Sequence, residues 1–184
     1  MGVADSLIEL PLGSPAPDFA LPGVDGKTHS LQSFNDRKIL VVMFTCNHCP
    51  YVQANERRLI EIQRDYAAQG VQLVAINANE TEHYPEDRFE EMQKRAKQIG
   101  YNFPYLRDGT QKVADAYKAT HTPHVMVFDQ ERHLRYAGRV DDNWKEPAQV
   151  KSQDLRNALE DLLAGQAVRV PQTFAVGCTI KWRT

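Results

Sequence analysis

A continuous apolar run at residues 39–44 constrains the fold more than any other feature of this sequence. The run reads Ile-Leu-Val-Val-Met-Phe and is rich in strand-forming residues. It is too short for an amphipathic helix, and it contains no polar residue. It therefore predicts a central strand buried on both faces, the kind found where helices pack on each side of a sheet.

The segments around this strand alternate between strand and helix periodicity. Strands that alternate with helices predict parallel pairing through right-handed crossovers, and two adjacent final strands predict an antiparallel edge. Gly70 and Gly100 are expected to end two of the helices. The expected elements are a hairpin at residues 19–31, strands at 39–44, 71–76, 103–106, 125–128 and 134–136, and helices at 52–66, 89–99, 111–117 and 152–164, the last with Ser152 as its N-cap.

The composition fits one globular domain. The 184 residues are 42% hydrophobic, which suits a single sizeable core. The 22 basic and 24 acidic residues leave a net charge of -2, which argues against a protein that binds nucleic acid electrostatically. No repeat or linker divides the chain. We expect a single α/β domain over residues 1–184, with a core at about 15–165 and a tail at 166–184.

The chain begins MGVADSLIELPLGS, which contains neither a basic n-region nor an apolar h-region. The longest apolar run is far shorter than a membrane span. The three cysteines are an odd number, which argues against a disulfide framework of the secreted kind. If the N-terminus is complete, these features predict a cytoplasmic protein with no membrane partner.

Two of the cysteines form a Cys-x-x-Cys pair, Cys46-Asn47-His48-Cys49, between the apolar strand and the next helix. At a helix start this spacing brings both sulfurs within disulfide reach, and the free N–H groups there favour a thiolate. The pKa values of cysteines in such motifs fall to roughly 3.5–7.5, so we expect a Cys46 pKa below neutral. His48 either stabilises that thiolate or points into solvent.

A structural metal site is the alternative for this pair. Zinc needs four ligands, and here it would need Cys178 together with His121, His124 or His133. A lone Cys-x-x-Cys beside a β-α pattern is more typical of redox chemistry, so the expectation is no metal and no cofactor.

The chain resembles the thioredoxin superfamily, and within it the AhpC/TSA and TlpA-like branch of redoxins. The resemblance covers roughly residues 15–165. It rests on Ala16-Pro17-Asp18-Phe19 at the opening of the domain, on Thr45 to Pro50 between strand and helix, and on Thr122-Pro123 before a strand. It implies a thioredoxin-like fold, a central mixed sheet flanked by helices, here with an N-terminal hairpin, an insertion and a C-terminal tail.

The resemblance also implies a role for Pro123. In thioredoxin-like proteins the equivalent proline is cis and packs opposite the cysteine pair, and the preceding residue, here Thr122, offers backbone groups to an extended substrate. His121 and His124 flank this site and either face the cysteines or lie on the surface.

The sequence departs from the motifs of these redoxin families in three places. Placing Cys49 on the peroxiredoxin cysteine puts Cys46 and Val42 where that signature has threonine and proline. Leu40 stands where thioredoxin carries a buried aspartate, and the first glutamate after the pair is Glu56. The sequence therefore identifies no buried proton acceptor, and water or His48 remains for that role.

The remaining polar and tail residues have simple interpretations. The apolar tail should pack back on the domain, where Cys178 is either a small buried hydrophobe or a third redox thiol. The charge-rich stretch at residues 80–95 is interpreted as the solvated face of a helix. Arg139, Asp141 and Asp142 either frame a groove or solvate a turn, and turn chemistry favours the latter.

These observations predict a thiol–disulfide oxidoreductase with Cys46, Cys49 and His48 as catalytic residues and Thr122 and Pro123 as substrate-binding residues. Its partners would be protein or small-molecule disulfides and thiols, with a thiol reductant. One alternative is a peroxiredoxin-like antioxidant, a thiol peroxidase whose partner is peroxide. Another is a non-catalytic metal-binding or redox-gated module.

Overall fold

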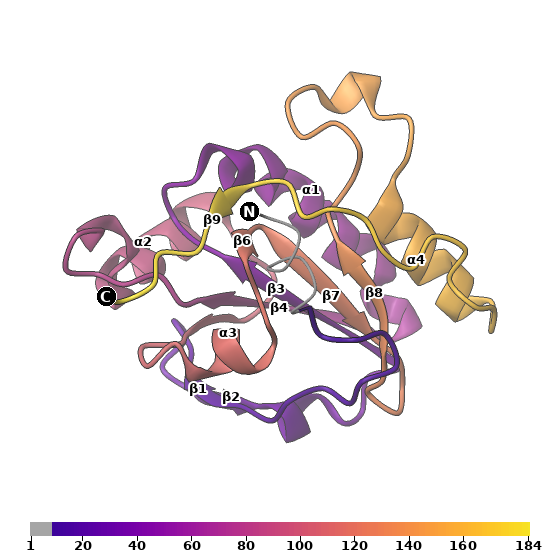
Figure 1. Ribbon diagram of the computed structural model, residues 1–184, viewed down its shortest axis with the longest axis horizontal. Helices are drawn as coiled ribbons and strands as arrows, with labels where there is room; N and C mark the ends of the chain where they lie inside the picture. The colour runs from indigo at the N-terminus through magenta and orange to yellow at the C-terminus, as the bar shows by residue number, and fades with distance from the viewer. Residues whose placement is uncertain (1–8) are drawn as a thin grey trace.

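The computed structural model describes residues 9–184, which form a five-stranded mixed sheet with packed layers on both faces (Figure 1). The strand order is β5-β4-β3-β7-β8. The central strand β3 pairs parallel with β4 and antiparallel with β7. The strands are β1 (Ala20–Pro22), β2 (Thr28–Ser30), β3 (Ile39–Thr45), β4 (Val71–Asn77), β5 (Tyr105–Arg107), β6 (His121–Thr122), β7 (His124–Phe128), β8 (Leu134–Gly138) and β9 (Cys178–Thr179).

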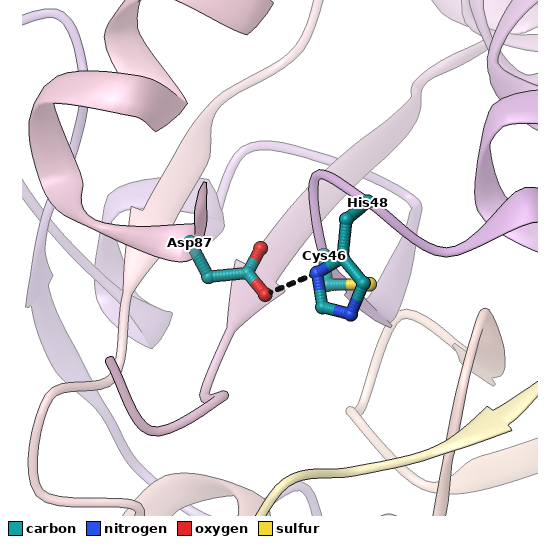
Figure 2. A group of neighbouring side chains, drawn as sticks. All are labelled: Cys46, His48 and Asp87. Carbon is teal, nitrogen blue, oxygen red and sulfur yellow. Dashed lines mark ion pairs between the residues drawn. The ribbon is translucent and has the colours of Figure 1, made fainter. Parts of the chain in front are cut away.

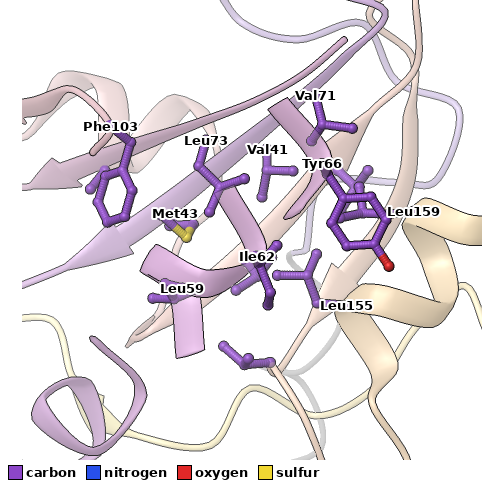
Figure 3. Close-up of a cluster of buried hydrophobic side chains, with 14 of the residues drawn as sticks. Val41, Met43, Leu59, Ile62, Tyr66, Val71, Leu73, Phe103, Leu155 and Leu159 are labelled. Atoms are coloured by element: carbon purple, nitrogen blue, oxygen red, sulfur yellow. The ribbon is translucent and has the colours of Figure 1, made fainter. Parts of the chain in front are cut away.

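Every residue of β3 is buried, and alternate side chains enter two different cores. Val41 and Met43 face a core formed with α1, α2 and α4 (Figure 3). Leu40 and Val42 face a second core with α3 and the β1–β2 hairpin. The helices are α1 (Pro50–Tyr66), α2 (Phe89–Ile99), α3 (Lys112–Ala116) and α4 (Asp154–Leu163). Across residues 9–184, none of the helices combines the length and the apolar character that crossing a membrane requires.

The structure confirms the α/β class and most of the expected elements. Gly70 and Gly100 adopt φ values of 88° and 79°, the left-handed conformation that glycine reaches without a Cβ clash. The expectation for Ser152 is wrong, because α4 begins two residues later with Gln153 as its N-cap. The hydroxyl of Ser152 instead donates to Asp154.

The tail returns across the domain and ends beside residues 80–84, which precede α2 (Figure 1). Thr173 is hydrogen-bonded to β8 through Ala137, and Ile180 is buried in the second core. Strand β9 then pairs antiparallel with β6, so the two strands lie side by side in Figure 1. The expectation that the tail packs back is confirmed for these segments, whereas the side chain of Phe174 is 89% exposed.

The buried His124 predicts a dependence of stability on pH. Burial, and to a lesser extent His121, lowers its pKa to about 4, whereas the unfolded chain carries an ordinary histidine. Between pH 6.5 and 4 the unfolded state therefore binds a proton that the folded state does not. We expect the free energy of unfolding to fall by on the order of 3 kcal/mol as the pH drops through this window.

Urea unfolding at several pH values measures this effect. His124→Asn should flatten the dependence between pH 6.5 and 4. His83→Asn, at a histidine whose side chain is 78% exposed, should leave it as in the unmodified protein. Equal slopes for the two variants would contradict the assignment to His124.

Candidate active site

The two cysteines of the Cys-x-x-Cys pair meet at the end of the central strand. Cys46 directly follows β3, and Cys49 is the N-cap of α1, with Pro50 as the first helical residue. The two thiols are free and hydrogen-bonded to each other. A proline is favourable at this helix position because the N–H that it lacks has no intrahelical partner there.

Both thiols of the pair are buried. Cys46 is 1% exposed and Cys49 0%. The helix begins at Pro50, two residues before the expected start, with Cys49 as its N-cap. Because α1 starts at Pro50, the N-terminal N–H groups and the helix dipole act on Cys49 rather than on Cys46.

The pKa of the Cys46 thiol accordingly lies above its ordinary value. Its hydrogen bond with Cys49 contributes most, followed by burial and the nearby Asp87 carboxylate. The pKa of Cys49 is lowered, first by the hydrogen bond with Cys46 and then, against the effect of burial, by hydrogen bonds with Cys178 and the backbone of Val52. These effects favour a thiolate on Cys49 over one on Cys46, against the expectation of a Cys46 pKa below neutral.

Thr122 contacts both sulfur atoms from the opposite side. The Thr122–Pro123 peptide bond is cis, as the sequence predicts. Cys46 Sγ lies 3.4 Å from the Thr122 hydroxyl oxygen, and Cys49 Sγ lies 3.4 Å from the Thr122 carbonyl oxygen. The Thr122 carbonyl oxygen accepts a hydrogen bond from Cys49, so this contact favours the thiol form of Cys49.

His48 forms an ion pair with an aspartate that the sequence analysis did not select. Its Nδ1 lies 2.7 Å from Oδ2 of the fully buried Asp87, and Figure 2 shows the carboxylate directed at the imidazole. The ring also stacks on Tyr84 at a centroid distance of 5.7 Å. Donor atoms of Cys46, His48 and Asp87 lie within 4.8 Å of one another. His48 therefore faces the cysteines and is held there.

The carboxylate of Asp87 accepts three further hydrogen bonds, all from asparagines. The Asn47 N–H donates at 2.7 Å, and the side-chain amides of Asn77 and Asn79 each donate at 3.0 Å. These contacts stabilise a charged carboxylate away from water. They also leave few free lone pairs for a metal ion, although Cys46, His48 and Asp87 together offer three donor atoms.

The position of Asp87 corrects the interpretation of residues 80–95 as a solvated helix face. Only α2 (Phe89–Ile99) is helical there, and Asp87 lies before it in a short 3-10 turn, Pro85–Asp87, with its side chain directed inward. The available signal was the pair Asn77 and Asn79, because polar residues at the end of a buried parallel strand lie beside the end of its neighbour.

The loop between the cysteines is fixed by its own side chains. The hydroxyl of Tyr105 donates to Asn47 Oδ1 at 2.8 Å, and the Asn47 amide donates to the Glu86 carbonyl oxygen at 2.8 Å. Gln53 donates to the Asn47 carbonyl oxygen at 3.0 Å. With these contacts, the relative position of the two thiols is set before any substrate binds.

The third cysteine also reaches the site. Cys178 pairs with Thr122 in the β6–β9 ladder, and its side chain packs against the cluster formed by Cys46, Cys49 and Val52. The backbone edge of Thr122, which the family resemblance assigns to an extended substrate, is therefore occupied by the chain's own tail.

The other predicted residues lie outside this cluster. His121 contacts the Thr120 hydroxyl, whereas His133 lies beside Asp129 and Glu131 at the β7–β8 turn. In the described part of the chain, none of the candidate histidines joins Cys178 and the pair in a group of metal donors. The residues after β8 form ion pairs and turn contacts, Arg139 with Asp154, Asp141 with Arg58 and Asp142 with the Lys151 N–H.

The fold and the site together define a thioredoxin-like redoxin. The chain belongs to the AhpC/TSA family, whose model matches residues 12–137. This confirms the resemblance found in the sequence, and the thioredoxin-like fold that it implied.

Three comparisons place the chain more closely. The solved structure of an uncharacterized conserved protein from Geobacillus kaustophilus is 43% identical, with a TM-score of 0.90 and coverage of 96% of this chain and 94% of that one. The thioredoxin domain of a thiol-disulfide oxidoreductase from Bacteroides vulgatus shares the fold at 18% identity, with a TM-score of 0.66 and coverage of 84% of this chain and 99% of that one. The thiol-disulfide oxidoreductase ResA of Geobacillus thermodenitrificans is 26% identical over 65% of this chain and 64% of its own length, so the match spans less than two thirds of that relative.

The Asp87 network predicts a large loss of stability for Asp87→Asn. The amide nitrogen would face donors that now meet a carboxylate oxygen, which leaves buried N–H groups without acceptors. We expect the free energy of unfolding to fall by about 1–3 kcal/mol in urea unfolding at neutral pH. Glu86→Gln is the matched control, because the Glu86 side chain is 46% exposed, and it should change this energy by less than about 0.5 kcal/mol. Similar losses in the two variants would rule out a special role for Asp87.

Proposed function

We propose that this protein is a thiol–disulfide oxidoreductase in which Cys46 and Cys49 alternate between a dithiol and a disulfide. The convergence of both buried thiols on Thr122 is the observation that carries the proposal, because each sulfur lies 3.4 Å from an atom of that residue and the two cysteines pack in one small cluster. The relationship to ResA, at low identity, supports the same class of reaction.

The reaction begins with Cys46 attacking one sulfur of a substrate disulfide. Its proton passes to the Cys49 thiolate, to which it is already hydrogen-bonded, and the other substrate sulfur leaves as a thiolate. Cys49 then returns that proton to the leaving thiolate and attacks the Cys46 sulfur. The products are the Cys46–Cys49 disulfide and two substrate sulfurs, which hold one proton and one negative charge between them.

His48, held by Asp87, lies beside the thiols during this exchange. Asp87 fixes the imidazole orientation through its 2.7 Å contact with Nδ1, and the ring remains 26% exposed. An imidazole so held links the buried pair to solvent and offers a route for proton exchange between the active site and water. Asp87 acts through His48 and is a positioning residue.

The substrates that we propose are protein or small-molecule disulfides, with a thiol reductant to regenerate the dithiol. The same steps run backward oxidise a dithiol, and the direction depends on the surrounding redox poise.

Serine substitutions test the order of the two thiols. Cys46→Ser should lower the rate of insulin reduction with dithiothreitol by at least about 100-fold, because the attacking sulfur is gone. Cys49→Ser should accumulate a mixed disulfide between Cys46 and a substrate peptide, visible by mass spectrometry. A mixed disulfide that accumulates on Cys49 in the Cys46→Ser variant instead would reverse the assigned order.

The purified protein also distinguishes the oxidoreductase from the two alternatives, a thiol peroxidase and a metal-binding module. Hydrogen peroxide consumed by the reduced protein faster than a substrate disulfide would favour a peroxidase. One equivalent of zinc or copper in protein purified under reducing conditions, with no turnover of insulin, would favour a metal-binding module.

A further inference from the structure

The C-terminal tail is built to hold Cys178 at the active site. The N–H of Ile180 donates to the Thr120 carbonyl oxygen at 3.0 Å, and Ile180 is 4% exposed. One residue on, the N–H of Lys181 donates to the Asn79 side chain at 2.9 Å, and its carbonyl oxygen accepts from Glu80 and Gln111. These contacts fix the chain directly after Cys178, so its position does not rest on the two-residue ladder alone.

Gly177 permits the close approach of the tail to the cis peptide. A Cβ atom at this position would lie 2.0 Å from the Thr122 carbonyl oxygen and 2.6 Å from its carbonyl carbon. Any other residue would push the tail away from the backbone of Thr122, since both contacts are with main-chain atoms. The position of Cys178 against Cys49 therefore depends on the glycine that precedes it.

The three thiols form an ordered series with Cys49 in the middle. Cys49 Sγ lies 3.4 Å from the carbonyl oxygen of Thr122, the residue with which Cys178 pairs, whereas Cys46 Sγ contacts the Thr122 hydroxyl on the other side. Cys178 contacts the same small apolar cluster, formed by Cys46, Cys49 and Val52. Thiol–disulfide exchange proceeds by attack of one sulfur on the sulfur of a disulfide, so a central sulfur with a neighbour on each side has the arrangement that exchange requires.

We propose that Cys178 is a third redox-active residue, which the tail presents to Cys49 as an internal substrate strand. In the oxidised protein Cys178 attacks Cys49, the Cys49–Cys178 bond forms, and the Cys46–Cys49 bond breaks. The proton of Cys178 goes to the departing Cys46 sulfur, so one disulfide and one thiol remain throughout and no outside oxidant is needed. This inference rests on the proposed function, because it starts from the Cys46–Cys49 disulfide.

Two single-cysteine replacements test the order of the thiols. Reduced Cys46→Ser and Cys49→Ser proteins are incubated with oxidised glutathione, alkylated and digested with trypsin. Cys49 lies in the tryptic peptide of residues 39–57 and Cys178 in that of residues 170–181, so a disulfide between them joins two peptides. Cys46→Ser should form this cross-link at least tenfold faster than Cys49→Ser forms a cross-link between Cys46 and Cys178. Equal rates, or no cross-link in Cys46→Ser, would overturn the proposal.

Gly177→Ala in the Cys46→Ser background tests whether the tail strand delivers the thiol. The variant keeps both remaining cysteines and should form the Cys49–Cys178 cross-link at least tenfold more slowly, with thermal unfolding followed to confirm that the domain is folded. An unchanged rate would contradict delivery by the paired strand.

The unmodified protein, treated in the same way, separates this proposal from the proposed function. A Cys46–Cys49 disulfide with no cross-linked peptide at any ratio of oxidised to reduced glutathione would refute the role of Cys178 and leave the oxidoreductase intact. Absence of the Cys46–Cys49 disulfide would contradict the oxidoreductase itself.

Discussion

Thr122 is the residue on which the three thiols converge. Its hydroxyl contacts Cys46, its carbonyl oxygen contacts Cys49, and its backbone pairs with Cys178. The residue is 2% exposed and lies between the buried strand β7 and the edge where the tail is bound. A small shift of Thr122 would change the environment of all three sulfur atoms, so the geometry of the site depends on this peptide more than on any single cysteine.

Burial changes the pKa values of the two thiols in a way that the Cys-x-x-Cys motif alone does not predict. A thiolate away from water must be stabilised by nearby donors, and Cys49 finds them in two thiols and the backbone N–H of Val52. For Cys46 the hydrogen bond with Cys49, burial and the carboxylate of Asp87 all raise the pKa and favour the thiol. Stabilising one thiolate of the reduced pair favours the dithiol, which makes the corresponding disulfide a stronger oxidant.

The sequence could predict the fold because the fold rests on local patterns. The apolar run at residues 39–44 and the glycines Gly70 and Gly100 each specify an element or its end without reference to the rest of the chain. The start of α1 could also have been predicted from the sequence. Pro50 favours the first helical position, which places Cys49 at the N-cap.

Asp87 could not be found in the same way. Its partners Asn47, Asn77 and Asn79 come from the ends of two neighbouring strands, and the aspartate comes from a third segment with no periodic signal. Asp87 can be recognised as a site residue only once β3 and β4 are paired in register, with Thr45 opposite Asn77. The position of Cys178 could not be predicted either, because a two-residue strand has no sequence pattern that identifies it.

The tail and an extended substrate compete for one surface. If a substrate strand is to pair with Thr122, β9 must leave, and the thiol of Cys178 leaves with it. While the tail is bound, Cys46 and Cys49 are closed to large molecules, since neither is more than 1% exposed. Access of a protein substrate and access of Cys178 to Cys49 are therefore mutually exclusive, which orders the two exchanges in time. In the proposed cycle, the substrate would be processed while β9 is displaced, and the return of β9 after product release would bring Cys178 to the Cys46–Cys49 disulfide.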